Sequence, residues 1–290
     1  MGDARPLTAF VLAGGGSLGA VEVGMLRALA AEGLEPDLIV GSSAGAINGA
    51  YFAADPTPDG VEKLDRLWRD IKRSDILPLG LRDLLRLALQ RGRSGHMVEA
   101  AGLRRLLERH LSYRLIEDAK VPLHVVATDR TLGTEVLISS GPVIDAVLAS
   151  TAIPGVYPPV AIGGRELIDG GVCANTPIAA AIRLGAQRLF VLPTGFACAL
   201  KRPPASPIGQ ALHALSLLVA RQFTQDIERY APQVALHVVP PLCPVDTSTY
   251  DYSACGALID RALTSTREWI ERGGLETPLG MPHEMVMHGH

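Results

Sequence analysis

A strand, a glycine turn and a helix follow one another twice near the N-terminus, and this pattern constrains the fold most. Residues 7–13 (LTAFVLA) form an apolar run that ends in three glycines, and the mostly apolar segment 18–32 after them predicts a helix. Residues 37–40 (DLIV) predict a second short strand, and the Ala- and Gly-rich segment 43–54 predicts a second helix. Two such units in succession are typical of βαβ connections and therefore of a parallel sheet.

The remainder of the chain continues this α/β pattern after an interruption. No strand is predicted over about residues 56–110, which we interpret as a helical insertion. Further predicted strands are 123–128, 134–139, 160–162, 166–168, 189–192 and 234–239, and further predicted helices are 61–71, 99–110, 143–149, 208–230 and 256–272. One more helix is predicted to start at residues 175–177, with Pro177 at its first helical position. No internal repeat or linker is evident, so we expect one domain over 8–272, followed by a C-terminal tail over 273–290.

Composition excludes several classes of protein. The chain has 290 residues, of which 48% are hydrophobic and 4% aromatic, and its formal net charge is −3. This charge argues against a nucleic-acid-binding protein with a basic surface, and the hydrophobic fraction is too high for intrinsic disorder. No apolar run approaches the ~20 residues of a membrane-spanning helix, and the N-terminus lacks the pattern of a signal peptide. Four cysteines are scattered without zinc spacing, so we expect no metal, no other cofactor and a reduced cytoplasmic setting.

Residues 41–45 match the pattern G-x-S-x-G and place Ser43 between a predicted strand and a predicted helix. In hydrolases with this pattern the serine lies on a sharp turn, and the flanking glycines, here Gly41 and Gly45, let neighbouring backbone pass close. A serine at a helix N-terminus also lies where free N–H groups favour developing negative charge. The alternative is an ordinary Gly/Ser turn that caps a helix, so Ser43 as a nucleophile is a hypothesis at this point.

The glycine-rich run at 14–19 supports two interpretations. It fits the dinucleotide-binding pattern G-x-G-x-x-G, which also needs an acidic residue at the end of the next strand to bind a ribose. That strand has an acid only at its start, Asp37, which weakens this interpretation. The other interpretation is an oxyanion hole in which the backbone amides of Gly15 and Gly16 face developing negative charge.

A serine nucleophile needs a base, and the histidines are poor candidates. None of the eight histidines lies in a glycine- or proline-marked loop after a clear strand, and His124 and His237 fall within apolar strands. Asp169 instead ends a predicted strand and precedes Gly170 and Gly171, so its carboxylate is expected at an edge of the sheet. Taken alone, Asp169 is equally consistent with an ordinary turn aspartate.

Four segments extend these motifs and occur in a fixed order. They read LAGGGSLGA, DLIVGSSAGAINGA, ASTAIPGVYPPV and IDGGVCANTPI. In sequence and in order they resemble the motifs of patatin-like phospholipases, strongly over about residues 8–195 and more loosely as far as Arg272. The resemblance implies a three-layer α/β/α sandwich with a mostly parallel central sheet, and a serine lipid acyl hydrolase.

The resemblance also implies roles for individual residues. In that family the serine of G-x-S-x-G and the aspartate of D-G-[GA] form a dyad without histidine, and the glycine-rich turn forms the oxyanion hole. At the matching positions, Ser43 is the nucleophile, Asp169 the base, and Gly14, Gly15 and Gly16 the oxyanion hole.

One position departs from the family pattern. Many members carry Arg or Lys where this chain has Leu18. The backbone amides survive that change, but a cation that could hold an anionic headgroup is not carried over. An ester hydrolase is therefore implied more firmly than a phospholipase.

Two other functions and one surface question stay open from the sequence. An α/β-hydrolase-type esterase or acyltransferase would use Ser43 with His237, although a serine as early as the second strand argues against it. A nucleotide-binding protein would use the glycine run. The expected partner is a lipid or another acyl ester.

A leucine stripe at Leu81–Leu89 lies within a segment (79–95) of net charge +3. It is either a lid in peripheral contact with a membrane or, as we expect, a helix packed on the core.

Overall fold

The computed structural model describes residues 5–76, 98–195 and 207–279. Its strands are β1 (Thr8–Leu12), β2 (Leu38–Ser42), β3 (Leu123–Asp129), β4 (Glu135–Ile138), β5 (Val160–Ile162), β6 (Arg165–Asp169), β7 (Arg188–Leu192) and β8 (Ala235–Val238). They form one sheet in the order β5-β6-β3-β2-β1-β7-β8, with β4 paired to β3 outside this path. The five strands β3, β2, β1, β7 and β8 run parallel, and β4, β5 and β6 pair antiparallel with their neighbours.

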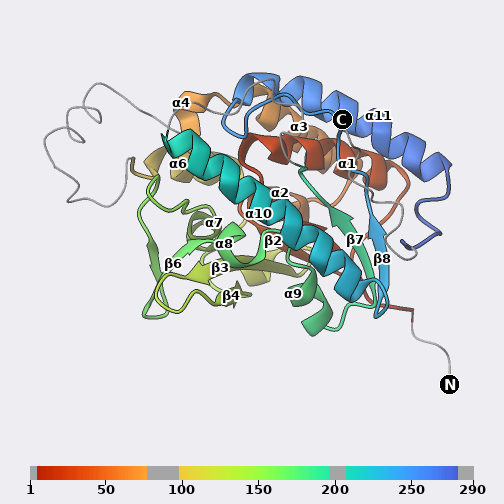
Figure 1. Cartoon of the computed structure of the whole chain (residues 1–290), viewed down its shortest axis with the longest axis horizontal. Coiled ribbons are helices and arrows are strands. Elements are labelled where there is room, and N and C mark those ends of the chain that lie inside the picture. The colour runs from red at the N-terminus through yellow and green to blue at the C-terminus, as the bar shows by residue number, and fades with distance from the viewer. Residues whose placement is uncertain (1–4, 77–97, 196–206, 280–290) are drawn as a thin grey trace, which may run out of the picture.

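The helices connect these strands along the chain (Figure 1). They are α1 (Gly19–Ala31), α2 (Ala44–Ala54), α3 (Pro58–Asp70), α4 (Arg73–Ile76), α6 (Ala101–His110), α7 (Val143–Ser150), α8 (Gly171–Ala174), α9 (Ile178–Arg183), α10 (Pro207–Tyr230) and α11 (Cys255–Glu271), with short 3₁₀ turns at Gly16–Leu18, Ile116–Asp118 and Tyr252–Ala254. No helix in the described part of the chain is long and apolar enough to cross a bilayer.

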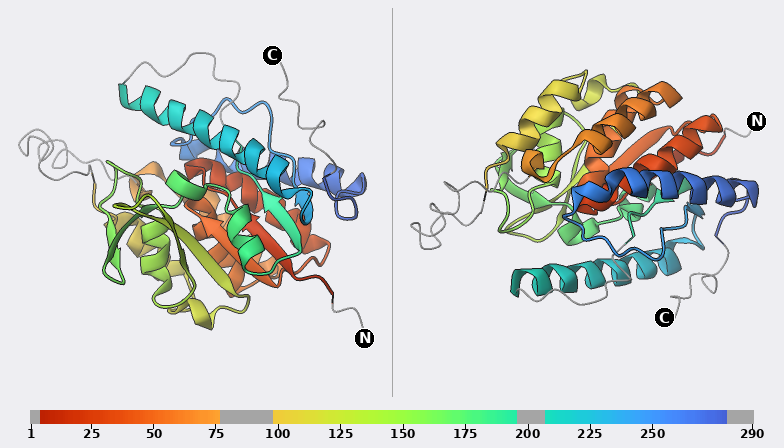
Figure 2. Two further views of the ribbon diagram at one scale, coloured as in Figure 1. Left: turned by 60° about the horizontal axis from the view of Figure 1, so that its bottom comes forward. Right: turned by 90° about the horizontal axis from the view of Figure 1, so that it is seen from above.

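Apolar side chains of the buried strands point to both faces of the sheet, so helices must cover both faces. On β1, Phe10 and Leu12 belong to a large apolar cluster with residues of α1, α2, α3, α7 and α11. Their neighbours Ala9 and Val11 belong to a second cluster with residues of α9 and α10. Because successive side chains of a strand point to opposite faces, the two clusters lie on opposite sides of the sheet. Figure 2 shows the same arrangement, and the expected three-layer α/β/α fold with a mostly parallel sheet is confirmed.

The predicted helical insertion is observed where the structure describes it. α3, α4 and α6 lie between β2 and β3 in the chain, and α3 packs against α1, α2 and α11. The amphipathic stripe of α3, which includes Val61, Leu64 and Trp68, is buried in the large cluster. The stripe at Leu81–Leu89 lies outside the described residues, so the choice between a lid and a packed helix stays a prediction.

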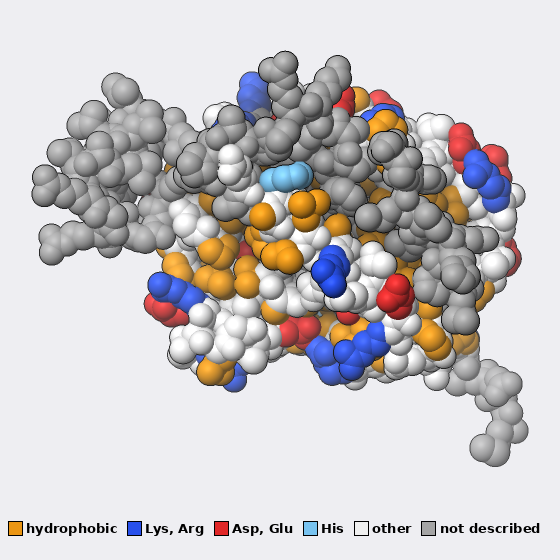
Figure 3. All heavy atoms as spheres, in the orientation of Figure 1, with side chains coloured by type: hydrophobic (Ala, Val, Ile, Leu, Met, Phe, Trp, Pro, Cys, Tyr) orange, Lys and Arg blue, Asp and Glu red, His pale blue; other side chains and the backbone are white. Residues whose placement is uncertain are grey.

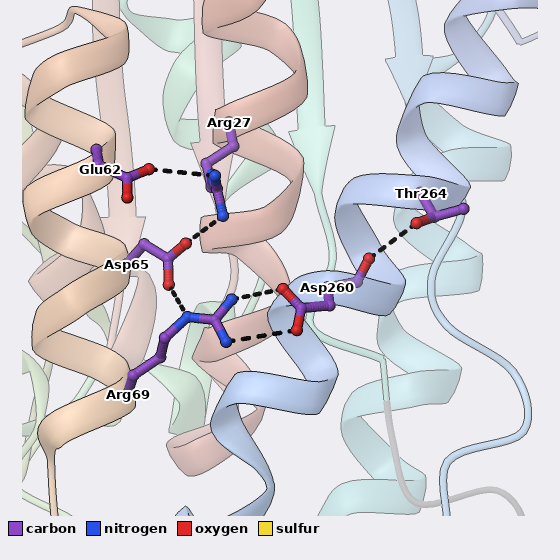
Figure 4. A network of polar contacts seen from close by, with 6 residues as sticks. All are labelled: Arg27, Glu62, Asp65, Arg69, Asp260 and Thr264. Atoms are coloured by element: carbon purple, nitrogen blue, oxygen red, sulfur yellow. Dashed lines mark hydrogen bonds and ion pairs between the residues drawn. The ribbon is translucent and has the colours of Figure 1, made fainter.

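A network of charged side chains joins the outer helices α1, α3 and α11 (Figure 4). Asp65 on α3 is 2% exposed and forms ion pairs with Arg27 of α1 and Arg69 of its own helix. Arg69 also pairs with Asp260 of α11. The network fixes three helices relative to one another on the face of the sheet that carries the large cluster.

The structure differs from the sequence prediction in two local features. The short helix α8 begins at Gly171, directly after Asp169 and Gly170, where no helix was predicted from the sequence. Pro177 was expected at the first helical position, but it lies one residue earlier, as the N-cap of α9. Both differences arise because glycine and proline mark a break in the chain without fixing which residue takes the first helical conformation.

Candidate active site

Two strands that end at adjacent positions of β3 bring Ser43 and Asp169 together. β2 ends with Ser42 opposite Val126, and β6 ends with Asp169 opposite Ala127. β2 runs parallel to β3 and β6 antiparallel to it, so residues that are 126 positions apart in sequence become neighbours. The site lies at the carboxyl end of the parallel strands, where open α/β sheets place their binding sites.

Ser43 has the backbone geometry of a strained strand-to-helix turn. Its φ is +52° and its ψ is −119°, and within the described ranges it is the one residue other than glycine with a positive φ. Such a conformation costs about 1–3 kcal/mol and is characteristic of functional sites. The flanking glycines are required by close packing: a Cβ on Gly41 would lie 2.4 Å from the Gly45 carbonyl oxygen, and one on Gly45 would lie 2.4 Å from the Leu12 carbonyl oxygen.

The Ser43 hydroxyl donates a hydrogen bond of 2.8 Å to Oδ2 of Asp169. Oδ1 of Asp169 accepts a second bond, of 2.7 Å, from the Gly171 N–H. Both side chains are nearly buried, with Ser43 8% and Asp169 6% exposed. Burial raises the pKa of Asp169 to about 6, and the bonds from Ser43 and Gly171 oppose this shift only in part. Asp169 is therefore ionised at neutral pH but binds a proton more strongly than an ordinary aspartate, whose pKa is about 3.9.

The glycine-rich turn, called here the glycine loop (residues 14–19), lies against the serine. A Cβ on Gly14 would be 3.0 Å from the Ser43 Cβ and 2.4 Å from Oδ1 of Asn175. The Gly14 N–H donates to the Asn175 carbonyl oxygen at 2.9 Å, and the Gly14 carbonyl accepts from Thr194 Oγ1 at 2.7 Å. The first glycine of the loop is thus fixed on both sides, and its N–H already has an acceptor.

Gly15 and Gly16 differ from Gly14 in this respect. Neither of their N–H groups donates a hydrogen bond to any residue in the described ranges. Gly16 has a φ of +59°, and a Cβ there would lie 2.4 Å from the Thr249 carbonyl oxygen. These two amides follow Gly14, which lies against Ser43, and they are the groups of the glycine loop that can bind an added acceptor.

A distant loop supports the glycine loop from outside. The Ser17 N–H donates to the Thr249 carbonyl oxygen at 2.8 Å, and the Ser17 hydroxyl donates to the Ser248 carbonyl oxygen at 3.1 Å. The sequence gives no sign of this contact, because residues 248–249 lie more than 230 positions along the chain from Ser17. The first and the last parts of the described chain therefore build the site together.

Ser150 supports the serine turn from α7 and was not singled out from the sequence. Its hydroxyl accepts the Ser43 N–H at 2.8 Å and donates to the Val126 carbonyl oxygen at 2.5 Å. Its position within the segment ASTAIPGVYPPV was the available signal. Because the Ser43 N–H is occupied, it cannot serve as a donor to substrate.

The structure does not bring His237 to Ser43. His237 lies on β8, which β7 and β1 separate from β2, and its register partner on β2 is Ile39, four residues before Ser43. Its Nδ1 is 3.0 Å from the Gly274 carbonyl oxygen, and its ring stacks on Phe190 with 4.6 Å between centroids. His237 is 3% exposed, which fits the structural interpretation made from the sequence.

Comparison with known proteins agrees with these motifs. The family model described as "Patatin-like phospholipase" matches residues 10–182. Patatin-like phospholipase domain-containing protein 7 of Rattus norvegicus is 30% identical over 189 residues, which are 64% of this chain and 13% of that protein. An NTE family protein of Mycobacterium bovis is 32% identical over 178 residues, 61% of this chain and 46% of that protein. The chain thus spans less than half the length of these relatives.

Among solved structures, VipD from Legionella pneumophila superposes with a TM-score of 0.48 at 15% identity, covering 93% of this chain and 67% of VipD.

Proposed function

The chain belongs to the patatin-like phospholipase family, and from this premise we propose that it is a lipid acyl hydrolase with Ser43 as nucleophile and Asp169 as base. The observation that carries the proposal is the 2.8 Å hydrogen bond from the Ser43 hydroxyl to Asp169. It joins a strained serine at a helix N-terminus to a buried carboxylate of raised pKa. A nucleophile in contact with its base is the arrangement that covalent acyl transfer needs.

The reaction proceeds in two halves. Asp169 accepts the hydroxyl proton as Ser43 Oγ attacks the acyl carbonyl, and the proton then passes to the leaving alcohol oxygen. Water attacks the acyl-enzyme with Asp169 again as base, and the fatty acid leaves as Ser43 regains its proton. The oxyanion of each tetrahedral intermediate is bound by the amides of Gly15 and Gly16, each worth about 3 kcal/mol. Gly14 contributes space rather than a donor, since its N–H is held by Asn175.

Leu18 places an apolar side chain where many family members carry a cation. Its side chain is fully buried, so the position that holds a cation in many family members brings no charge to the site. We therefore propose hydrolysis of fatty-acyl esters in general, without a requirement for an anionic headgroup. The reaction needs no metal ion or cofactor.

Exposed apolar side chains on α8 and α10 support a lipid substrate. Val172, on the helix that follows Asp169, is 43% exposed, and three leucines of α10 are 40–65% exposed: Leu215, Leu217 and Leu218. α10 is tied to α8 by a hydrogen bond from Gln222 to the Cys173 carbonyl oxygen. Figure 3 shows hydrophobic side chains in the middle of the face that carries these helices. We propose that acyl chains, or the surface of a lipid aggregate, contact this face.

The catalytic unit in this proposal is longer than the matched family region. The family model ends at residue 182, whereas the backbone of Thr249 holds the glycine loop. We propose a single catalytic domain from β1 to α11, close to the 8–272 expected from the sequence.

Hydrolysis of a short-chain nitrophenyl ester and of a panel of phospholipids, lysophospholipids and glycerides tests the proposal. Wild type should release fatty acid, and Ser43→Ala and Asp169→Asn should lose activity while remaining folded. His237→Ala should retain it. If His237→Ala abolishes turnover in a folded protein, or if Ser43→Ala stays active, the dyad is not the catalytic machinery.

A further inference from the structure

We propose that Glu22, which no motif of the sequence singles out, positions the glycine loop relative to the nucleophile. Glu22 lies on α1, three residues beyond the end of the loop, and is fully buried. The inference rests on the proposed function, because its effect is on an oxyanion hole formed by that loop. Glu22 touches no substrate and acts through Ala13, the residue just before the loop.

The two carboxyl oxygens of Glu22 accept from two different parts of the site. Oε1 accepts the backbone N–H of Ala13 at 2.6 Å, where β1 passes into the glycine loop; the same N–H makes a longer bond, of 3.3 Å, to the Leu192 carbonyl oxygen of β7. Oε2 accepts Nδ2 of Asn48 at 2.7 Å. Asn48 lies on α2, the helix that begins directly after Ser43. One side chain therefore joins the start of the oxyanion loop to the helix that carries the nucleophile.

The rest of the network fixes the orientation of the Asn48 amide. Nδ2 of Asn48 also donates to the Gly19 carbonyl oxygen at 2.9 Å, and Oδ1 accepts the indole N–H of Trp68 at 2.7 Å. Glu22 and Asn48 are fully buried and Trp68 is 3% exposed. The Asn48 amide cannot rotate without breaking its bonds to Gly19 and Trp68. A buried polar group left without a partner destabilises the fold by more than the net contribution of the hydrogen bond that it loses.

This arrangement needs a carboxyl group rather than an amide. Two N–H donors, from Ala13 and Asn48, converge on the side chain at position 22. A carboxyl offers an oxygen to each, whereas a glutamine would set its own NH₂ against one of them. The conflict would displace either the Ala13 amide or Asn48. Burial raises the pKa of Glu22, as expected for a carboxyl with no cation among its partners.

The test compares Glu22→Gln, Asn48→Asp and the double variant, with Asp65→Asn as the matched control. In the double variant, a glutamine at 22 can accept from Ala13 and donate to an aspartate at 48, whose second oxygen accepts from Trp68. The Gly19 carbonyl oxygen loses the donor from position 48, and the second N–H of the glutamine has no acceptor among these residues. Asp65→Asn is also a change from a buried carboxyl to an amide, but it lies in the ion-pair network of the outer helices.

We expect Glu22→Gln to lower kcat for nitrophenyl ester hydrolysis about 10- to 100-fold, since displacement of a positioning group by about 1 Å costs on that order. KM should change less than about threefold, because the oxyanion hole binds the transition state rather than the bound substrate. The double variant should recover most of the lost kcat. Asp65→Asn should lower the melting temperature and leave kcat within about threefold, because its network does not contact the loop.

Three results would overturn the inference. The first is a folded Glu22→Gln variant with unchanged kcat. The second is a double variant whose kcat is no higher than that of Asn48→Asp alone, a comparison that holds even if Glu22→Gln does not fold. The third is equal loss of kcat in Glu22→Gln and Asp65→Asn, which would indicate a general effect of stability. Failure of the proposed function is a separate result, seen as activity of Ser43→Ala in the wild-type background.

Discussion

Asp169 and Asp65 are both nearly buried aspartates, and their surroundings differ in one respect. Asp65 is 2% exposed and lies between Arg27 and Arg69 in the outer helix layer (Figure 4). Asp169 is 6% exposed at the end of a strand, and its two oxygens accept from a hydroxyl and a backbone N–H, both neutral. One carboxylate has cationic partners and the other has none.

This difference gives the two carboxylates different roles. Removing one partner of a buried ion pair is destabilising, so Asp65 has a structural role. A buried carboxyl with only neutral partners keeps a raised proton affinity, and burial raises the pKa of Asp169 to about 6. A buried carboxylate of raised pKa that contacts a nucleophile is typical of a catalytic base. The same change from carboxyl to amide at the two positions should therefore have opposite consequences.

The largest expected difference is in turnover. Asp169→Asn should lower kcat about 10³-fold, because loss of a general base typically costs 10²–10⁴. Asp65→Asn should leave kcat within about threefold, because it lies outside the site. Initial rates of nitrophenyl ester hydrolysis at pH 8 measure both. Equal losses in the two variants would remove the distinction between the carboxylates.

The next effect concerns the groups that face the oxyanion. A Cβ at Gly15 would lie 2.4 Å from Thr194 Oγ1, so Gly15→Ala should displace the glycine loop. We expect kcat to fall about 10²-fold, comparable to the loss of one oxyanion donor. Gly133→Ala is the control, since a Cβ there meets nothing within 4 Å; its φ of +67° adds a backbone strain that Gly15, with an extended φ of 176°, does not have. If both variants lose stability equally and neither loses kcat, the loop does not bind the oxyanion.

A third effect is on folding stability at the structural aspartate. Asp65→Asn should lower the free energy of unfolding by about 2–3 kcal/mol, less than for a fully buried pair because both arginines are partly exposed. Urea denaturation at neutral pH measures this loss. An unchanged midpoint would mean that the ion pairs add nothing to stability.

The smallest effect has the opposite sign and depends on pH. In the unfolded chain Asp169 ionises near pH 4, whereas in the folded chain its pKa is about 6. The folded state therefore binds more protons between these values, and wild-type stability should fall as pH rises from 4 to 6. Asp169→Asn removes this cost, so its stability relative to wild type should increase over that range by on the order of 2 kcal/mol. Urea denaturation at pH 4 and pH 7.5 compares the two proteins, and a difference independent of pH would contradict the raised pKa.

The sequence predicted those parts of the molecule that depend on local pattern. The strand–turn–helix units around residues 14–16 and 41–45 follow from apolar runs and glycines, whereas the pairing of Ser43 with Asp169 was implied only by the family resemblance of the four motifs. α8 was missed, because an Asp-Gly-Gly run is typical of a turn and does not signal a helix.

Contacts between distant residues were beyond sequence patterns. Glu22 is one polar residue in an apolar helix, and only the fold places its carboxyl against Ala13 and Asn48. The backbone of Thr249 holds the glycine loop through a carbonyl group, which every residue type carries and which leaves no trace in the sequence. A polar residue just after a strand is a usable signal for some of these contacts, and Thr194, two residues beyond β7, is an example.

The most direct test of the dyad is labelling of the protein with an alkyl fluorophosphonate, followed by peptide mass spectrometry and by labelling rates from pH 4.5 to 8.5. We expect a single adduct on Ser43, a rate that rises with pH to a plateau with its midpoint near 6, and labelling of Asp169→Asn that is slower and lacks this midpoint. The two other titratable groups whose pKa values are affected by Asp169, Cys173 and Tyr250, have raised pKa values and should not titrate in this range. An adduct on another residue, or a midpoint that persists in Asp169→Asn and disappears in His237→Ala, would contradict the Ser43–Asp169 dyad.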